Sequence, residues 1–301
     1  MTIPNTALIT NYNACQKAAM IRLLFKFFSQ FPLSWLWAFG APLGSFVWFA
    51  SKNYRLKSLA HIGAAGFDPE GSLPAAVRAN TGRLMAELPA IWFWSEPRLI
   101  AHCHSASESV LLQAIEQAAR ERRGLLFMTP HLGSFEVIPR YIAKHLPITV
   151  LYKPAKNPAV DRLICEARNR GLVRSVPADL GGVRALLRCL QRGEAVGLLP
   201  DQVPSQGDGQ LAPFFSRPAW TMTLPRGLIE RLNPIVLIAV AERRLCTTVS
   251  GRGAWEIHFE AYHGASSPQA INAAMEQWIR RLPEQYLWSY NRYKGTEVPN
   301  R

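Results

Sequence analysis

A histidine and a glutamate five residues apart, His131 and Glu136, form the pair best suited to acid–base chemistry in this sequence. The apolar residues 125–128 predict a short buried strand that Thr129-Pro130 should end. We therefore expect His131 in a turn and Glu136 in the first turn of a following helix, where the helix dipole favours a carboxylate. A carboxylate that accepts the proton of one ring nitrogen leaves the other nitrogen free to deprotonate a substrate hydroxyl. The pair is thus predicted to be a general-base dyad with no nucleophile of its own.

The spacing alone is weak evidence, because a histidine that precedes an acid by five residues often arises by chance. The alternative is a glutamate that stabilises the start of a helix, next to an incidental loop histidine. The surrounding sequence must therefore support the catalytic interpretation.

The elements that would position this pair alternate between helix and strand from about residue 105 onward. Such alternation predicts an α/β fold with a mixed, largely parallel sheet flanked by helices. A chain of 301 residues with 49% hydrophobic residues can bury a core of that size. The expected helices are 109–121, 161–169, 182–192 and 269–282, and the expected strands are 125–128, 148–152, 173–176, 195–199, 235–240 and 255–259.

Residues 31–50 contain no charged side chain and many aromatic ones, and basic residues flank them on both sides. Twenty such residues are long enough to cross a bilayer, so we expect a membrane-inserted segment that spans the bilayer or re-enters it. The alternative is a buried hydrophobic hairpin, because Pro32, Gly40, Pro42 and Gly44 would interrupt a helix. The predicted organisation is a membrane-anchor segment, 1–57, followed by a catalytic domain, 58–301.

The chain carries a net charge of +13, and residues 137–192 hold eleven Lys and Arg against three Asp and Glu. This imbalance predicts a surface that meets phosphates or the carboxylates of an acidic protein. No nucleic-acid-binding motif is present, so nucleic acid is not an expected partner. Five widely spaced cysteines without a Cys-x-x-Cys motif are typical of reduced thiols, and no metal site is expected.

A second candidate residue, Asp201, follows the predicted strand at 195–199. Strand ends of a parallel sheet are where such folds place their chemistry. The polar stretch 203–213 that comes next predicts a long loop, and long loops inside compact domains are usually functional.

Together these residues resemble the bacterial lipid A late acyltransferases, of the lauroyl and myristoyl acyltransferase kind, within the glycerolipid acyltransferase superfamily. The similarity covers roughly residues 20 to 295. The segments that carry it are the His-x4-Glu motif at 129–136, then 151–157, 168–171, 199–202, 213–215 and 285–294. The glycerol-phosphate acyltransferases of the superfamily have a Glu-Gly-x-Arg segment that this sequence lacks, which argues against phosphatidic acid synthesis.

The resemblance implies an enzyme that transfers a fatty acyl chain from acyl-carrier protein to a hydroxyl of an anionic lipid A precursor, in lipopolysaccharide biosynthesis. His131 and Glu136 would be catalytic, and Arg168 and Asp201 would position acceptor and donor. It also implies an anchor in the inner membrane with the catalytic domain on its cytoplasmic face, and no cofactor.

Other functions remain open from the residues alone. A hydrolase would need a nucleophile, and no Gly-x-Ser-x-Gly elbow occurs. An acyltransferase for another membrane lipid, or a basic membrane-binding protein without catalysis, would also explain the charge and the apolar segment.

Overall fold

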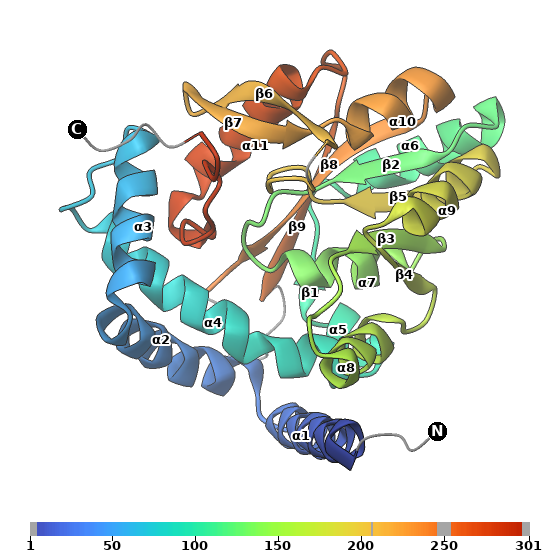
Figure 1. The fold of residues 1–301 in the computed structure, drawn as a ribbon. Coiled ribbons are helices and arrows are strands. Elements are labelled where there is room, and N and C mark those ends of the chain that lie inside the picture. The colour runs from blue at the N-terminus through green and yellow to red at the C-terminus, as the bar shows by residue number, and fades with distance from the viewer. Residues whose placement is uncertain (1–4, 206, 246–253, 297–301) are drawn as a thin grey trace.

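The computed structural model describes residues 5–205, 207–245 and 254–296, with side chains at residue 16 and from residue 18 onward. A seven-stranded sheet lies at the centre, in the order β1-β9-β8-β2-β5-β3-β4 (Figure 1). The strands are β1 (Cys103–His104), β2 (Leu125–Met128), β3 (Ile148–Tyr152), β4 (Val173–Pro177), β5 (Ala195–Leu198), β8 (Ile235–Arg243) and β9 (Trp255–Ala261). Among these described strands, β8 and β9 pair antiparallel and the other neighbours pair in parallel. The expected mixed, largely parallel α/β fold is confirmed.

Helices cover both faces of the sheet. They are α3 (Lys52–Ala64), α4 (Leu73–Phe93), α5 (Glu96–Ile100), α6 (Glu108–Glu121), α7 (Ile138–Ile142), α8 (Pro158–Arg168), α9 (Leu180–Gln191), α10 (Leu224–Leu232) and α11 (Pro268–Arg281), preceded by α1 (Asn5–Phe28) and α2 (Leu33–Ala50). The 3-10 turns η1 (Phe135–Val137) and η2 (Pro283–Gln285) complete the set.

The four residues of β2 show how the core divides. All four are buried, and successive side chains point to opposite faces. Leu125 and Phe127 belong to a core cluster with α4, α6 and α7, whereas Leu126 and Met128 belong to a second cluster with α9 and α11. A strand buried on both faces is a continuous apolar run, which is why the sequence predicted it correctly.

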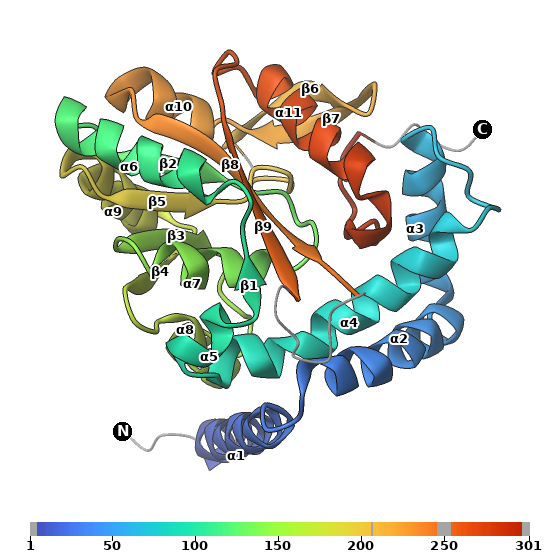
Figure 2. The same ribbon diagram turned by 180° about the vertical axis from the view of Figure 1, so that it is seen from behind.

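The apolar segment forms one uninterrupted helix, α2, despite Pro42 inside it. The alternative interpretation, a hairpin interrupted by these prolines and glycines, is therefore wrong. Its glycines serve close packing instead: α2 lies beside α4 (Figure 2), and a Cβ on Gly44 would come within 2.0 Å of the carbonyl oxygen of Arg78. A Cβ on Gly82 of α4 would likewise come within 2.0 Å of the carbonyl oxygen of Gly40. Only hydrogen side chains allow the two backbones to approach so closely.

Two further features differ from expectation. The stretch predicted as a long polar loop, 203–213, runs into β6 (Gly209–Phe214), which pairs with β7 (Arg217–Met222) in a separate two-stranded sheet. Its glycines and prolines hid the short strands. The boundary predicted at residue 57 falls inside α3.

Of the cysteines, Cys103, Cys165 and Cys189 are free thiols, while Cys246 and the side chain of Cys15 lie outside the described part.

Candidate active site

Neighbouring strand ends bring the candidate residues together. Strands β2 and β5 are paired in parallel, so Met128 and Leu198 lie opposite one another at their carboxyl ends. His131 follows β2 by three residues and Asp201 follows β5 by three residues. The sheet therefore places two residues 70 positions apart in sequence at the same edge.

Asp201 binds His131 through both of its carboxylate oxygens. Oδ1 lies 2.7 Å from the ring Nδ1 of His131, and Oδ2 accepts the backbone N–H of His131 at 2.9 Å. Because an ionised carboxylate can only accept hydrogen bonds, the proton of the neutral imidazole must sit on Nδ1. The lone pair then sits on Nε2, where the side-chain amide of Gln202 donates to it at 2.9 Å.

The Asp201 carboxyl is fully buried, yet it is held in its ionised form. Burial by itself would raise its pKa, but the charge and the hydrogen bonds of His131, with the charge of Arg292, outweigh burial and lower the pKa below its ordinary value. The Tyr286 phenol is also fully buried, and burial together with the Asp201 anion raises its pKa well above the usual value. Asp201 is therefore an ionised acceptor that fixes the tautomer of the neutral His131 ring.

Glu136 makes a different contact from the one expected. Its carboxylate binds the guanidinium of Arg168 through two hydrogen bonds, from Nε at 2.9 Å and from Nη2, and the indole N–H of Trp92 donates to it at 3.4 Å. The expected hydrogen bond from His131 to Glu136 is replaced by the one to Asp201. The reason is local geometry: Glu136 lies in the tight turn η1 and its side chain reaches α8, which carries Arg168.

Arg168 is correspondingly held as a cation. Its burial would lower the pKa of the guanidinium, but the paired Glu136 carboxylate raises it above the ordinary value. Arg168, which was predicted to bind substrate, thus uses two of its nitrogens to bind Glu136, which was predicted to be catalytic. Its guanidinium also lies over the ring of Tyr152, 6.0 Å from the ring centroid.

The turn that carries His131 uses its own backbone donors. The N–H groups of residues 131 to 134 donate in order to Asp201, Pro130, Gln285 and Ala241. Gly133 adopts φ +60°, and a Cβ there would come within 2.0 Å of the carbonyl oxygen of Ala241, so this position requires glycine. All four N–H groups are therefore engaged inside the protein.

A cavity of about 580 Å³ opens beside the histidine. It is within the size range of pockets that hold a small organic ligand. His131, Glu136, Arg168 and Gln202 supply polar groups to its wall. Most of the remaining lining is apolar and includes Ile91, Trp92, Phe127, Phe135, Ile138, Ile148, Val150, Leu151, Leu198 and Met222.

The excess of basic residues after the histidine is only partly a surface. Arg140 is buried and donates to the carbonyl oxygens of Ile91 and Trp94, and Lys144 pairs with Glu108. Lys153 lines the cavity, and Lys156 nearby in sequence is exposed. Arg140 also lines the cavity, but its guanidinium is engaged by these carbonyl oxygens, so the two lysines are better suited to meet an anionic substrate.

A buried carboxylate thus orients a histidine at the strand ends of an α/β sheet, beside a largely apolar cavity. Residues 19–295 match the profile of the family described as bacterial lipid A biosynthesis acyltransferase. The chain belongs to this family, which supports a role in the late acylation of lipid A.

Three curated proteins show the extent of the similarity. A lipid A biosynthesis palmitoleoyltransferase of Escherichia coli K12 is 27% identical over 223 residues, 73% of this chain and 70% of that protein. A lipid A biosynthesis acyltransferase of Haemophilus influenzae is 29% identical over 194 residues, 62% and 59% of the two chains. A lipid A biosynthesis lauroyltransferase of Escherichia coli K12 is 24% identical over 230 residues, 74% and 72%.

Sequence reasoning did not assign a role to Gln202, although it stands next to Asp201 in a segment that carries the resemblance. It also passed over Glu87, a buried residue of α4. The available signal was one acid in an otherwise apolar stretch, 84–94, because such a residue is seldom buried without partners.

Proposed function

We propose that this protein transfers a fatty acyl chain from the thioester of an acyl-carrier protein to a hydroxyl of a lipid A precursor, with His131 as the general base. The observation that carries the proposal is the orientation of His131. Asp201 holds Nδ1, and Nε2 contacts the amide of Gln202, which lines the apolar cavity together with His131. A fatty chain in that cavity brings its thioester carbon next to a base that can activate an incoming hydroxyl.

The reaction needs no covalent enzyme intermediate. Nε2 of His131 takes the proton of the acceptor hydroxyl while that oxygen attacks the thioester carbonyl carbon. The carbon–sulfur bond then breaks, and the protonated histidine returns its proton to the departing sulfur, which leaves an ester and a free thiol. The buried Asp201 carboxylate stabilises the imidazolium between the two steps.

Gln202 can take part in this reaction. Its amide occupies the site on Nε2 that the acceptor hydroxyl must take. When the hydroxyl displaces it, the amide N–H becomes free to donate to the oxyanion that forms on the thioester carbonyl. This role fits the engagement of the backbone N–H groups of the histidine turn.

We propose that Glu136 and Arg168 act as a unit on the acceptor side. The carboxylate holds two nitrogens of the guanidinium, Nε and Nη2, and so fixes the plane in which Nη1 can meet a phosphate of the lipid. Glu136 would then be required for activity without touching the histidine, and Asp201 would be the catalytic partner.

We propose that the N-terminal helices hold the enzyme on the cytoplasmic face of the inner membrane. One side of α2 is buried against α4, while its other side exposes Phe39 and Phe46, which are 66% and 69% accessible. Exposed apolar residues of α1, such as Leu23 and Phe27, extend this surface. Because the buried side stays on the protein, we favour a helix that lies in the membrane interface over one that spans the bilayer.

Mass spectrometry of lipid A from cells with and without the gene tests the proposal. We expect a mass difference of one acyl chain, and the same loss when His131→Ala replaces the wild-type gene. A purified enzyme that releases free fatty acid from the thioester at equal rates with and without the lipid acceptor would instead make it a hydrolase.

A further inference from the structure

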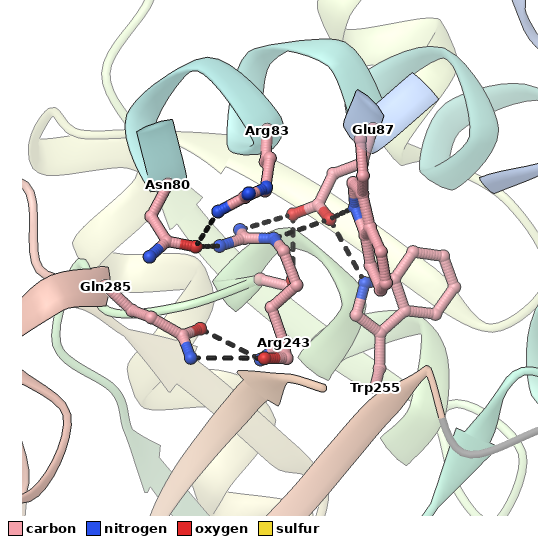
Figure 3. A network of polar contacts seen from close by, with 8 residues as sticks. Asn80, Arg83, Glu87, Arg243, Trp255 and Gln285 are labelled. Carbon is pink, nitrogen blue, oxygen red and sulfur yellow. Dashed lines mark hydrogen bonds and ion pairs between the residues drawn. The ribbon is translucent and has the colours of Figure 1, made fainter. Parts of the chain in front are cut away.

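A buried carboxylate in α4, Glu87, is the centre of a polar network (Figure 3). It is fully inaccessible and accepts five hydrogen bonds. Arg243 donates from Nε at 3.0 Å and Nη2 at 2.8 Å, Trp37 and Trp255 donate their indole N–H groups at 2.7 and 3.2 Å, and the Ser134 hydroxyl donates at 2.7 Å. Such a set leaves the buried charge paired and its lone pairs occupied.

Two of these contacts reach the turn that carries His131. Ser134 is three residues after the histidine and binds the carboxylate directly. Gly133 donates to the backbone of Gln285, whose side-chain amide in turn bonds the backbone N–H and carbonyl of Arg243, at 2.9 and 3.2 Å. The turn is thus tied to one network at two successive residues.

The remaining contact of interest comes from the apolar N-terminal helix. Trp37 belongs to α2, on the side that packs against α4. Its indole N–H and the Ser134 hydroxyl donate to opposite oxygens of the same carboxylate, Oε2 and Oε1. Both hydrogen bonds are 2.7 Å long, which is a well-formed length. A shift of α2 that moves the Glu87 carboxylate therefore also moves the acceptor of the Ser134 hydroxyl.

We propose that Glu87 is a positioning residue, which holds the His131 turn in its active conformation and links that conformation to the seating of α2. The inference rests on the proposed function, because it assigns Glu87 its effect through His131. A displacement of about 1 Å at a reacting group can cost roughly 100-fold in rate. The network therefore makes the rate of transfer depend on the position of α2, although no described residue of α2 lines the cavity.

Three variants test this inference in the purified full-length enzyme: Ser134→Ala, Trp37→Phe and the double variant. Each single change removes one donor to Glu87 and leaves Arg243 paired with it. We expect each to lower kcat by about 10- to 100-fold with little change in KM, at a temperature where thermal unfolding shows the protein folded. The kcat of the double variant should be only slightly below that of the less active single variant, because both donors act through one carboxylate.

Trp48→Phe is the matched control. Trp48 is also a buried indole of α2, but it packs against Tyr54 and is not among the described donors to Glu87. It should keep kcat even if its melting temperature falls as far as that of Trp37→Phe. A role in packing alone would instead lower stability in both tryptophan variants and leave kcat unchanged in both.

The inference is overturned if Ser134→Ala or Trp37→Phe retains kcat within roughly two-fold of wild type, if their effects on kcat multiply, or if Trp48→Phe loses as much. Failure of the proposed function has a separate signature, namely a His131→Ala enzyme that still transfers the chain. Glu87→Gln is less decisive, because it removes the charge that pairs buried Arg243 and can prevent folding.

Discussion

Replacing Asp201 by asparagine decides which acid serves His131. The wild-type carboxylate accepts two hydrogen bonds from His131, one from the backbone N–H and one from Nδ1. An amide of the same size has one oxygen and one NH₂ group, so it cannot accept both. If the oxygen keeps the backbone bond, the NH₂ group faces Nδ1 and favours the tautomer with the proton on Nε2. The base is then blocked at the atom that should take the substrate proton.

The magnitude follows from the chemistry that is lost. General-base assistance by a positioned side chain contributes roughly 10²- to 10⁴-fold in rate. In serine proteases, an aspartate-to-asparagine change behind the catalytic histidine lowers kcat by about 10⁴-fold, because the histidine is held in the wrong tautomer. We therefore expect Asp201→Asn to lower kcat by roughly 10²- to 10⁴-fold, equivalent to about 3 to 5 kcal/mol of transition-state stabilisation.

The assay follows transfer of a radiolabelled acyl chain from the carrier thioester to the lipid acceptor under steady-state conditions. Asp208→Asn is the control, because it makes the same chemical change at an exposed position. Glu136→Gln should leave the histidine tautomer intact and act mainly on acceptor KM, since Glu136 binds Arg168. A kcat near wild type in Asp201→Asn, with a collapse of kcat in Glu136→Gln, would refute this reasoning and restore the pairing expected from the sequence.

The same variant carries a pH signature in stability. Folding lowers the pKa of the Asp201 carboxyl, so its charged form stabilises the native state above the ordinary carboxyl pKa, and this contribution is lost as the pH falls through the lowered native value. Below about pH 4, wild type should therefore lose stability more steeply than Asp201→Asn, as measured by chemical unfolding at successive pH values. Parallel slopes for the two proteins would contradict the ionised state assigned to this carboxyl.

Three further outcomes are expected. Arg168→Ala should raise acceptor KM strongly and Arg168→Lys should recover activity only in part, because lysine keeps the charge but loses the two-pronged pairing; kinetics with each substrate varied in turn measures this, and an unchanged acceptor KM in Arg168→Ala would remove it from acceptor binding. Phe39→Glu with Phe46→Glu should release the protein from membranes in a carbonate wash without lowering its melting temperature, since both side chains are exposed; retention in the pellet would mean that α2 is not the anchor. Gly44→Ala should destabilise by about 1 to 3 kcal/mol in thermal unfolding because its Cβ meets the α4 backbone, while Gly227→Ala, where nothing lies within 4 Å, should be neutral or stabilising; equal melting temperatures would show that the helices can separate freely.

The local pattern predicted much of the framework. The apolar run 125–128 must be buried on both faces, and the prolines and glycines around it end the strand, so the sequence placed His131 at a strand end without a structure. The alternation of such apolar runs with amphipathic segments likewise predicted an α/β fold with a largely parallel sheet. Hydrophobic periodicity is a property of neighbouring residues, and neighbours are visible in one dimension.

The carboxylate that binds His131 is determined by the order of strands in the sheet, which no local sequence pattern contains. Asp201 reaches Nδ1 because β5 lies next to β2, although β3 and β4 come between them in the chain. Glu136, only five residues from the histidine, turns away to Arg168 because the intervening backbone forms a tight 3-10 turn. Nearness in sequence was therefore a poor guide to which carboxylate accepts the proton.

In the apolar segment 31–50, some properties follow from the local sequence and others only from the tertiary structure. Its composition alone predicted a membrane-seeking segment, since burial and insertion both follow from apolar surface. Which side of α2 is covered, and that Trp37 meets Glu87, depended on the glycines that let α4 approach. Hydrogen bonds and close packing join residues that are distant in the chain, and only the folded arrangement determines those pairs.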